Sequence, residues 1–266
     1  MMSDDRTTAE IIAAACKEDD EEAYWALIGE LHGRGSQREF AAAQVLTQSK
    51  DAVEREMGAD ILGQLGHEEK AFHEESMAIL LDLLKDEAED VIASGAFSLG
   101  HRADARAIPA LLPLVAHSNA RVRSGVVSGL SGHEDKAAID ALIVLCRDKD
   151  FDVRNWATFG LGSMCEADSM EIRDVLWRAL EDRDAEIRGE AFIGLAKRRD
   201  HGIEPLLKEE LAGDFQGDWA VEAAGLLADP VYYPLLQEVR KRIAGVEPDY
   251  MVRGVDEALQ ACKPKN

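Results

Sequence analysis

The sequence predicts an all-α protein, a right-handed α-solenoid of about eight stacked helix pairs forming one domain over residues 1–266. Three observations predict this fold. An apolar frame recurs every 31–34 residues, and a leucine stands eight positions after each start of that frame. The composition favours helix, with abundant Ala and Leu, 6% aromatic residues and only 7 prolines. Repeats of this length are typical of helix pairs that bury their apolar stripes against neighbouring pairs.

The first helix of each unit follows from aligning the chain on one apolar anchor position. The anchors are Ala23, Met57, Val91, Val122, Val153, Ile187, Trp219 and Met251. The leucines eight positions later are Leu31, Leu65, Leu99, Leu130, Leu161, Leu195, Leu227 and Leu259. Positions 0, +4 and +8 share one face of a helix, so each anchor and its leucine delimit a buried stripe.

A second helix is predicted after a short turn in each unit. Apolar runs begin at Ala107, Ala138, Ile203 and Tyr232. Pro109 and Pro205 fall where the first turn of this helix should lie, a position that tolerates proline, whereas Pro113 should delay or kink its helix. A lone helix over residues 7–18 should precede the first unit, and the last unit should stop after its first helix.

Glycines mark two positions of the frame. Gly129, Gly160 and Gly194 stand seven residues after their anchors, where a glycine costs a helix about 1 kcal/mol, so we expect a neighbouring helix to pass close by. A glycine directly after the leucine should end the first helix. Those glycines are Gly66, Gly100 and Gly162.

The charge is the extreme feature of the composition. Thirty Lys and Arg against 52 Asp and Glu give a net charge of −22. Such a surface repels phosphate, which argues against nucleic acid and anionic membrane as ligands. The same field attracts and steers a basic protein, which is therefore the predicted partner.

The chain is expected to be cytoplasmic. Its acidic amino terminus has no basic stretch before an apolar run, and no run approaches the length of a membrane span. The four cysteines share no short spacing, so we expect unpaired thiols in a reducing compartment. They are Cys16, Cys146, Cys165 and Cys262.

The repeat frame resembles HEAT repeats of the phycobilisome-lyase-like class. The first half of that motif is matched by Asp152, Val153, Arg154, Ala157, Leu161 and Gly162, and the second by Asp104, Ala107, Ile108, Pro109 and Leu111. The runs DVRNWATFGLG and EIRGEAFIGLAKRRD are also similar to bacterial YibA-type HEAT-repeat proteins.

The resemblance implies a non-enzymatic, protein-binding scaffold without a cofactor. YibA-type proteins are linked to polymorphic toxin loci, which implies an immunity protein that neutralises a basic toxin domain. Two alternatives stay open: a bilin-lyase-type enzyme or chaperone, which would attach a tetrapyrrole to cysteine, and a general assembly scaffold with several partners.

A column of arginines follows the anchors of three successive units. These are Arg123, Arg154 and Arg188, with acids two residues earlier at Asp152 and Glu186, and Asp218 continues the acid column in the next unit. An anion-binding ladder is one interpretation. We favour bidentate Asp–Arg pairs that tie one repeat to the next.

The column three positions after the anchor is the least regular, which indicates that it faces something other than the core. Trp156, Glu190 and Glu222 occupy it in three successive units, and Asp60 occupies it nearer the amino terminus. An aromatic residue beside carboxylates is typical of protein interfaces. We predict that these residues bind the partner, with Trp177 as a weaker candidate; the alternative is a tryptophan that fills a gap between helices.

No catalytic, cofactor-binding or metal-binding residue is predicted. The sequence has no nucleophile elbow, phosphate-binding loop or dinucleotide motif. His-Glu pairs at residues 67–68 and 133–134 resemble those of deoxyhypusine hydroxylase, a HEAT-repeat iron enzyme. That family carries its pairs inside first helices, whereas these fall in turns, so we interpret them as solvated turn residues.

Overall fold

The computed structural model describes residues 6–213, 218–243, 245 and 249–264. Throughout these residues all regular structure is helical and no strand occurs, so the predicted all-α class is confirmed. The chain divides into two compact units, Met1–Ala141 and Leu142–Asn266, which are described separately.

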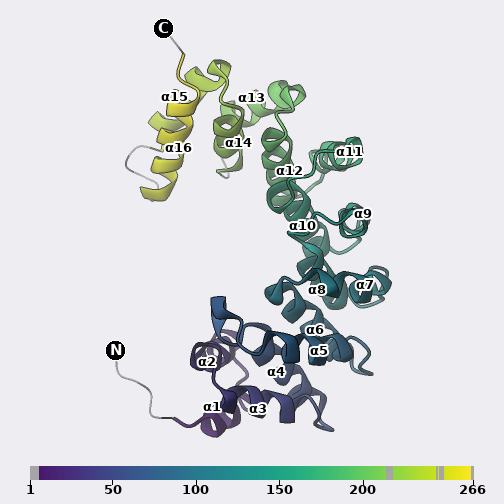
Figure 1. The fold of residues 1–266 in the computed structure, drawn as a ribbon. Helices are drawn as coiled ribbons and strands as arrows, with labels where there is room; N and C mark the ends of the chain where they lie inside the picture. The colour runs from purple at the N-terminus through teal and green to yellow at the C-terminus, as the bar shows by residue number, and fades with distance from the viewer. Residues whose placement is uncertain (1–5, 214–217, 244, 246–248, 265–266) are drawn as a thin grey trace. The chain divides into compact units, whose positions relative to one another are not determined.

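Unit 1 alternates first and second helices after one leading helix (Figure 1). Its elements are α1 (Thr8–Ala15), α2 (Glu21–Arg34), α3 (Gln37–Leu46), α4 (Ala52–Gly63), α5 (His73–Leu83), α6 (Glu89–Arg102), α7 (Ile108–Leu111) and α8 (Ala120–Leu130). As expected, α1 is a lone helix, and it packs against α2 and α3. Pro113 ends α7, which continues only as a 3₁₀ turn over Leu112–Leu114. The next helix, α9 (Lys136–Leu145), crosses the boundary between the units.

Unit 2 repeats the same alternation. Its elements are α10 (Phe151–Phe159), a π-helical turn (Gly160–Met164), α11 (Met170–Ala179), α12 (Ala185–Lys197), α13 (Glu204–Ala212), α14 (Trp219–Leu227), α15 (Tyr233–Arg242) and α16 (Asp249–Ala261). The first helices of this unit form a row in which α12 packs between α10 and α14, and α14 between α12 and α16 (Figure 1). Each second helix packs against the first helix that follows it in the chain.

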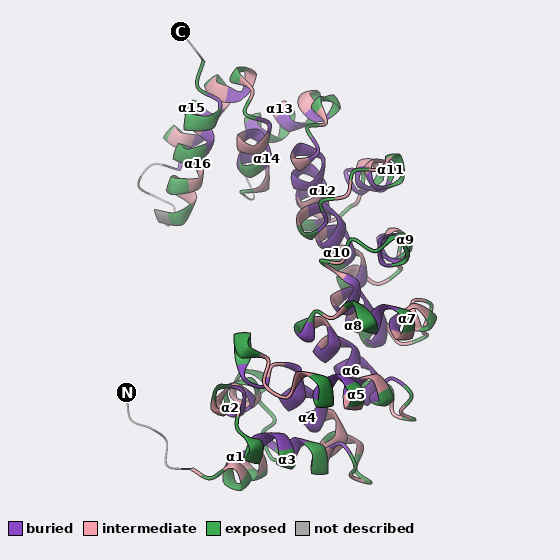
Figure 2. Cartoon of the chain, in the orientation of Figure 1, coloured by how far each residue is buried: buried purple, intermediate pink, exposed green. Residues whose placement is uncertain are grey.

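The core of each unit is the stripe that the frame predicts. Seven of the eight frame leucines are buried, and Leu259 in α16 is half-buried. Figure 2 shows the burial concentrated in first helices such as α6 and α12. Each buried leucine contributes about 1.5–3 kcal/mol, so the repeated stripe is the main source of stability.

Two buried arginines at the same register position hold neighbouring first helices together. Arg102 stands eleven residues after its anchor, and its Nε donates to the carbonyl of Leu62 on α4 at 2.8 Å. Arg198 holds the same position in unit 2 and donates to the carbonyls of Leu161 at 2.8 Å and Cys165 at 3.0 Å. A cation suits the last turn of a helix, where carbonyls lack partners. Burial lowers the pKa of Arg102 to about 10.

The expected close approach at the glycines is present in unit 2. A Cβ atom on Gly194 would lie 2.6 Å from Cα of Gly162, so any larger residue would push α12 away from α10. The predicted role of Gly100 and Gly162 in ending helices is wrong, because Gly100 lies inside α6 and Gly162 inside the π-helical turn. Ala103, in the left-handed conformation, caps α6 instead.

Candidate partner-binding surface

Three residues of the irregular column lie on neighbouring first helices of unit 2. Trp156 is on α10, Glu190 on α12 and Glu222 on α14. The Trp156 side chain is 54% exposed and meets Phe159 edge-on, with 5.7 Å between ring centroids. Glu222 is exposed and Glu190 half-buried. The fold therefore brings together three of the five residues predicted to bind a partner, on one row of helices.

Four carboxylates make this row strongly negative. We call Glu186, Glu190, Asp218 and Glu222 the acidic face. Burial raises the pKa of Glu190, and repulsion by Glu222, Asp218 and Glu186 raises it further. Burial and the charge of Asp218 likewise raise the pKa of Glu222. None of the four forms an ion pair within the described residues; Glu190 accepts only from Ser163 at 3.1 Å, and Glu186 from Asn155 at 3.2 Å.

The nearest cation is already engaged. Lys197 lowers the pKa of Glu222, but its Nζ donates to the carbonyl of Ser163 at 2.7 Å and pairs with Glu166 at 3.1 Å. The acidic face thus keeps negative charge that the fold does not neutralise. Neighbouring carboxylates of this kind repel one another and attract an external cation.

The position of α14 is fixed by an aromatic contact beside the acidic face. The ring of Trp219 covers Gly189 on α12 so closely that a Cβ atom there would lie 2.3 Å from the ring. Trp219 directly follows Asp218 in the chain. The same contact therefore also fixes the position of Asp218 at the start of α14.

Asp60 requires a correction. We expected this residue on a partner-binding surface, but it is buried in unit 1 with 9% exposure. Its carboxylate accepts hydrogen bonds from Tyr24 on α2, at 2.8 Å, and from Ser94 on α6. Burial raises the pKa of Asp60 to about 6. The carboxylate ties three first helices together and is not available to a partner.

Trp177 is not a free surface residue either. Its ring is half-buried, and its Nε1 donates to Asp200 at 3.2 Å. The ring also lies over Gly202, where a Cβ atom would be 3.0 Å from it. These contacts fix α11 to the turn before α13, which is a structural role.

The arginine column binds different acceptors from those expected. Nη1 of Arg154 donates to the carbonyl of Asp148 at 3.0 Å and its Nε to the carboxylate of Asp182 at 3.1 Å; Arg188 donates to the carbonyl of Asp182 at 2.9 Å. Arg123 is buried and donates to the carbonyl of His117 at 2.8 Å.

The predicted pairing of these arginines with Asp152 and Glu186 is therefore wrong. Asp152 and Glu186 are exposed in the first turns of α10 and α12 and Asp218 is exposed at the N-cap of α14, whereas the arginine hydrogen bonds given above end on the turns between helices. The missed signal is a residue five positions before four successive anchors, at Asp86, His117, Asp148 and Asp182. Asp86 shows that such a residue can bind an arginine. Its carboxylate accepts two hydrogen bonds from Arg55, of 2.7 and 2.8 Å.

Among the described residues, no group of three His, Cys, Asp or Glu could hold a metal ion, and His67 and Glu68 are exposed in the turn after α4. None of the four cysteines, all of which lie in the described part of the chain, forms a disulfide. No helix among these residues is long and apolar enough to cross a membrane.

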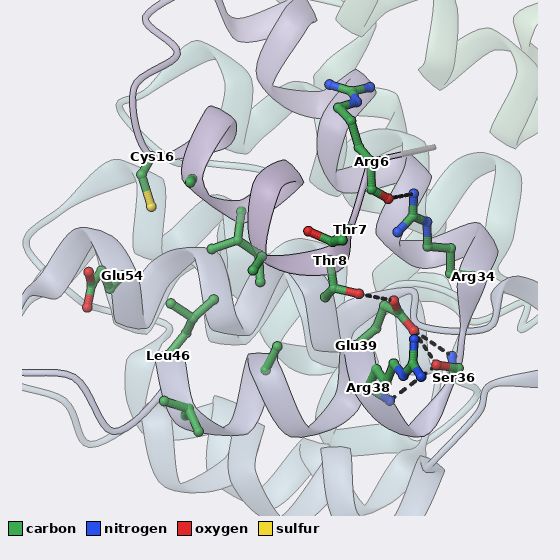
Figure 3. A pocket seen from close by; sticks show the side chains of 15 residues that line it. Arg6, Thr7, Thr8, Cys16, Arg34, Ser36, Arg38, Glu39, Leu46 and Glu54 are labelled. Atoms are coloured by element: carbon green, nitrogen blue, oxygen red, sulfur yellow. Dashed lines mark hydrogen bonds between the residues drawn. The ribbon is translucent and has the colours of Figure 1, made fainter. Parts of the chain in front are cut away.

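A hollow between α1 and α3 in unit 1 is shown in Figure 3. Its polar groups serve the ends of the local helices. Glu39 closes the capping box of α3 with Ser36, and it also accepts from Thr8 at 2.6 Å. Arg34 donates to the carbonyl of Arg6 at 2.8 Å. Because these charges are mutually satisfied, we place the candidate site on the acidic face and not here.

Comparison with known proteins identifies the repeat. Residues 77–162 match the family of HEAT repeats. Over 213 residues, which are 76% of this chain and 74% of the relative, the sequence is 32% identical to protein YibA of Escherichia coli K12. The chain belongs to the YibA family of HEAT-repeat proteins. The resemblance inferred from the sequence is confirmed.

A solved structure of a relative has the same fold. The crystal structure of Escherichia coli YibA matches with a TM-score of 0.68 and 26% identity, over 97% of this chain and 93% of that chain. The CpcE–CpcF complex of phycocyanin lyase from Nostoc matches with a TM-score of 0.49 and 15% identity, over 98% of this chain and 97% of that chain. A likeness as low as the second carries no argument about lyase activity.

Proposed function

We propose that this YibA-family chain is a non-enzymatic scaffold whose acidic face binds a basic protein. One observation carries the proposal: within the described residues four carboxylates on neighbouring helices form no ion pair, while an exposed tryptophan stands on the same row. The carboxylates repel one another, and no ion pair in that part of the chain offsets the repulsion. A lysine- or arginine-bearing partner would relieve that repulsion.

The two kinds of residue would act at different stages of binding. The negative field of the acidic face would accelerate encounter with a basic surface, with a strong dependence on salt. Trp156 would then bury its exposed ring in the partner and set the dissociation rate, as aromatic anchors do.

A more specific form of the proposal is neutralisation of a basic toxin domain by occlusion. It is supported by the resemblance to YibA-type proteins and by the charge of the acidic face. We also propose a cytoplasmic location, which is supported by four cysteines that form no disulfide. A general scaffold with several partners differs from an immunity protein in stoichiometry, because the latter should hold one partner tightly.

The test is affinity capture at low and high salt, followed by titration of the captured protein. The wild-type chain should retain one dominant basic protein that is shed at high salt. The triple variant Trp156→Ala, Glu190→Gln, Glu222→Gln should bind it at least about tenfold more weakly.

The matched control is Trp25→Ala, which removes a tryptophan that is 43% exposed in unit 1. It should bind as wild type does. Capture of an acidic partner, or equal affinity of the triple variant, would overturn the proposal. A captured nuclease or other toxin domain would support the neutralising role.

A further inference from the structure

A groove of about 410 Å³ runs between α14 and α16 at the carboxyl-terminal side of the acidic face. Its floor is apolar, with Val221 and Val255 buried and Leu226 and Met251 half-buried. Among the described residues of its lining are three carboxylates and no Lys, Arg or His. The three are Asp218, Glu222 and Glu257, so two members of the acidic face also line this groove.

The two helices are held together along one edge of the groove. A Cβ atom on Gly225 would lie 3.3 Å from Ala258, which shows that α14 and α16 are in close contact there. Nearby, the Sγ of Cys262 donates to the carbonyl of Ala224 at 3.2 Å. This edge is packed as tightly as a protein core.

The groove is open one helical turn away. A Cβ atom on Gly254 would meet nothing within 4 Å, although Gly254 lies only four residues before Ala258 on the same helix. Tyr250, a turn further on, is 59% exposed. The space over Gly254 is thus a slot with an apolar floor, an exposed aromatic ring at one end and carboxylates around it.

We propose that this slot takes an apolar side chain of the partner, flanked in that partner by lysine or arginine. The floor would bury the apolar group, and the three carboxylates would pair with the flanking cations. A second copy of this chain is a poor occupant, because each copy carries a charge of −22. The inference rests on the proposed function and specifies where on the surface the partner is anchored.

Gly254 offers a test, because a side chain there can start into the slot without a clash at its Cβ atom. Gly254→Trp replaces a helical glycine at a position with free space, so the fold should tolerate it. Gly29 on α2 also has nothing within 4 Å of its Cβ position, and Gly29→Trp is the matched control. Glu257→Gln removes one carboxylate of the groove that is outside the acidic face.

The probe is a synthetic peptide of alternating Leu and Lys pairs, titrated by calorimetry against the full chain. A second peptide with Gln in place of every Lys controls for charge. We expect Gly254→Trp to weaken binding of the lysine peptide about tenfold and Glu257→Gln about threefold, with Gly29→Trp unchanged.

Unchanged affinity in Gly254→Trp would overturn the slot. If the triple variant of Trp156, Glu190 and Glu222 then loses the peptide, the acidic face survives as the binding surface and only the slot fails. If the wild-type chain binds neither peptide, both proposals fail. Equal binding of the lysine and glutamine peptides would overturn the role of the carboxylates.

Discussion

The two units use the same register position for opposite purposes. In unit 1 the position three residues after the anchor holds Asp60 and Ser94, which bond to each other in the interior and, through Asp60, to Tyr24. In unit 2 it holds Trp156 and Glu222, whose side chains are exposed. The repeat frame fixes where a backbone position lies. Whether that position faces the interior depends on the side chains around it.

The largest loss of stability should come from the register position at which both units bury an arginine, eleven residues after the anchor. Arg102→Ala in unit 1 and Arg198→Ala in unit 2 should each lower the free energy of unfolding by about 3 kcal/mol, because buried carbonyls lose charged donors. Urea unfolding followed by circular dichroism measures this. Arg106→Ala is the control: its guanidinium is 53% exposed beside Glu74 and Asp104, so the loss of its ion pairs should cost much less stability. A loss in Arg102→Ala or Arg198→Ala no larger than that in Arg106→Ala would contradict the shared role.

A second, smaller loss of stability should distinguish unit 1 from unit 2 at the position three residues after the anchor. Asp60→Ala leaves the Tyr24 hydroxyl without the carboxylate that accepts from it, and leaves Ser94 only a long hydrogen bond of 3.4 Å to the carbonyl of Glu56, which should destabilise the protein by about 2 kcal/mol. Glu222→Ala should change stability by no more than about 0.5 kcal/mol, because its side chain is exposed. Thermal or urea unfolding of both variants distinguishes them. Similar losses in the two would mean that the position has one role in both units.

A smaller effect should appear in the pH dependence. Burial raises the pKa of Asp60 to about 6, although the hydrogen bonds from Ser94 and Tyr24 act in the opposite direction. The folded state therefore binds a proton more tightly than the unfolded state, and stability falls as pH rises from about 4 to above 6. Between pH 7 and pH 5 the wild type should gain about 1 kcal/mol relative to Asp60→Asn. Parallel pH profiles of the two proteins would contradict the buried carboxylate.

The smallest effect should be a gain in stability. Glu190→Gln removes one charge from the repelling acidic face, so it should stabilise the protein by about 0.5 kcal/mol at low salt and by less at high salt. The same change should weaken capture of the basic partner. A loss of stability that persists at high salt would show that the Glu190 carboxylate is needed for packing.

The spacing of apolar residues was enough to predict the helices and the core. The frame leucines are buried because positions 0, +4 and +8 of a helix must share a face. The prediction failed where spacing says nothing about three-dimensional neighbours. Gly100 follows a leucine as a helix-ending glycine would, yet α6 continues to Arg102, whose guanidinium is buried against the preceding first helix.

The candidate site was predicted only in part, because the sequence pattern does not show which side chains surround a given position. Variation along a column indicated the exposed Trp156 and Glu222 correctly, but it could not show that Tyr24 and Ser94 enclose Asp60. The partners of the arginines were also missed, because turn carbonyls leave no mark in the sequence. Only the aspartates five residues before the anchors, such as Asp182, could have indicated them.

The buried arginines have a consequence for how such a chain tolerates mutation. All of the Arg198 hydrogen bonds described above end on main-chain carbonyls, which every residue supplies. Replacing the side chains of those acceptor residues leaves the carbonyls in place, so no second substitution has to accompany the first. The hydrogen bonds that join adjacent repeats therefore do not depend on which exposed side chains the protein carries. Unit 2 can accordingly exchange its exposed side chains while the scaffold beneath them stays the same.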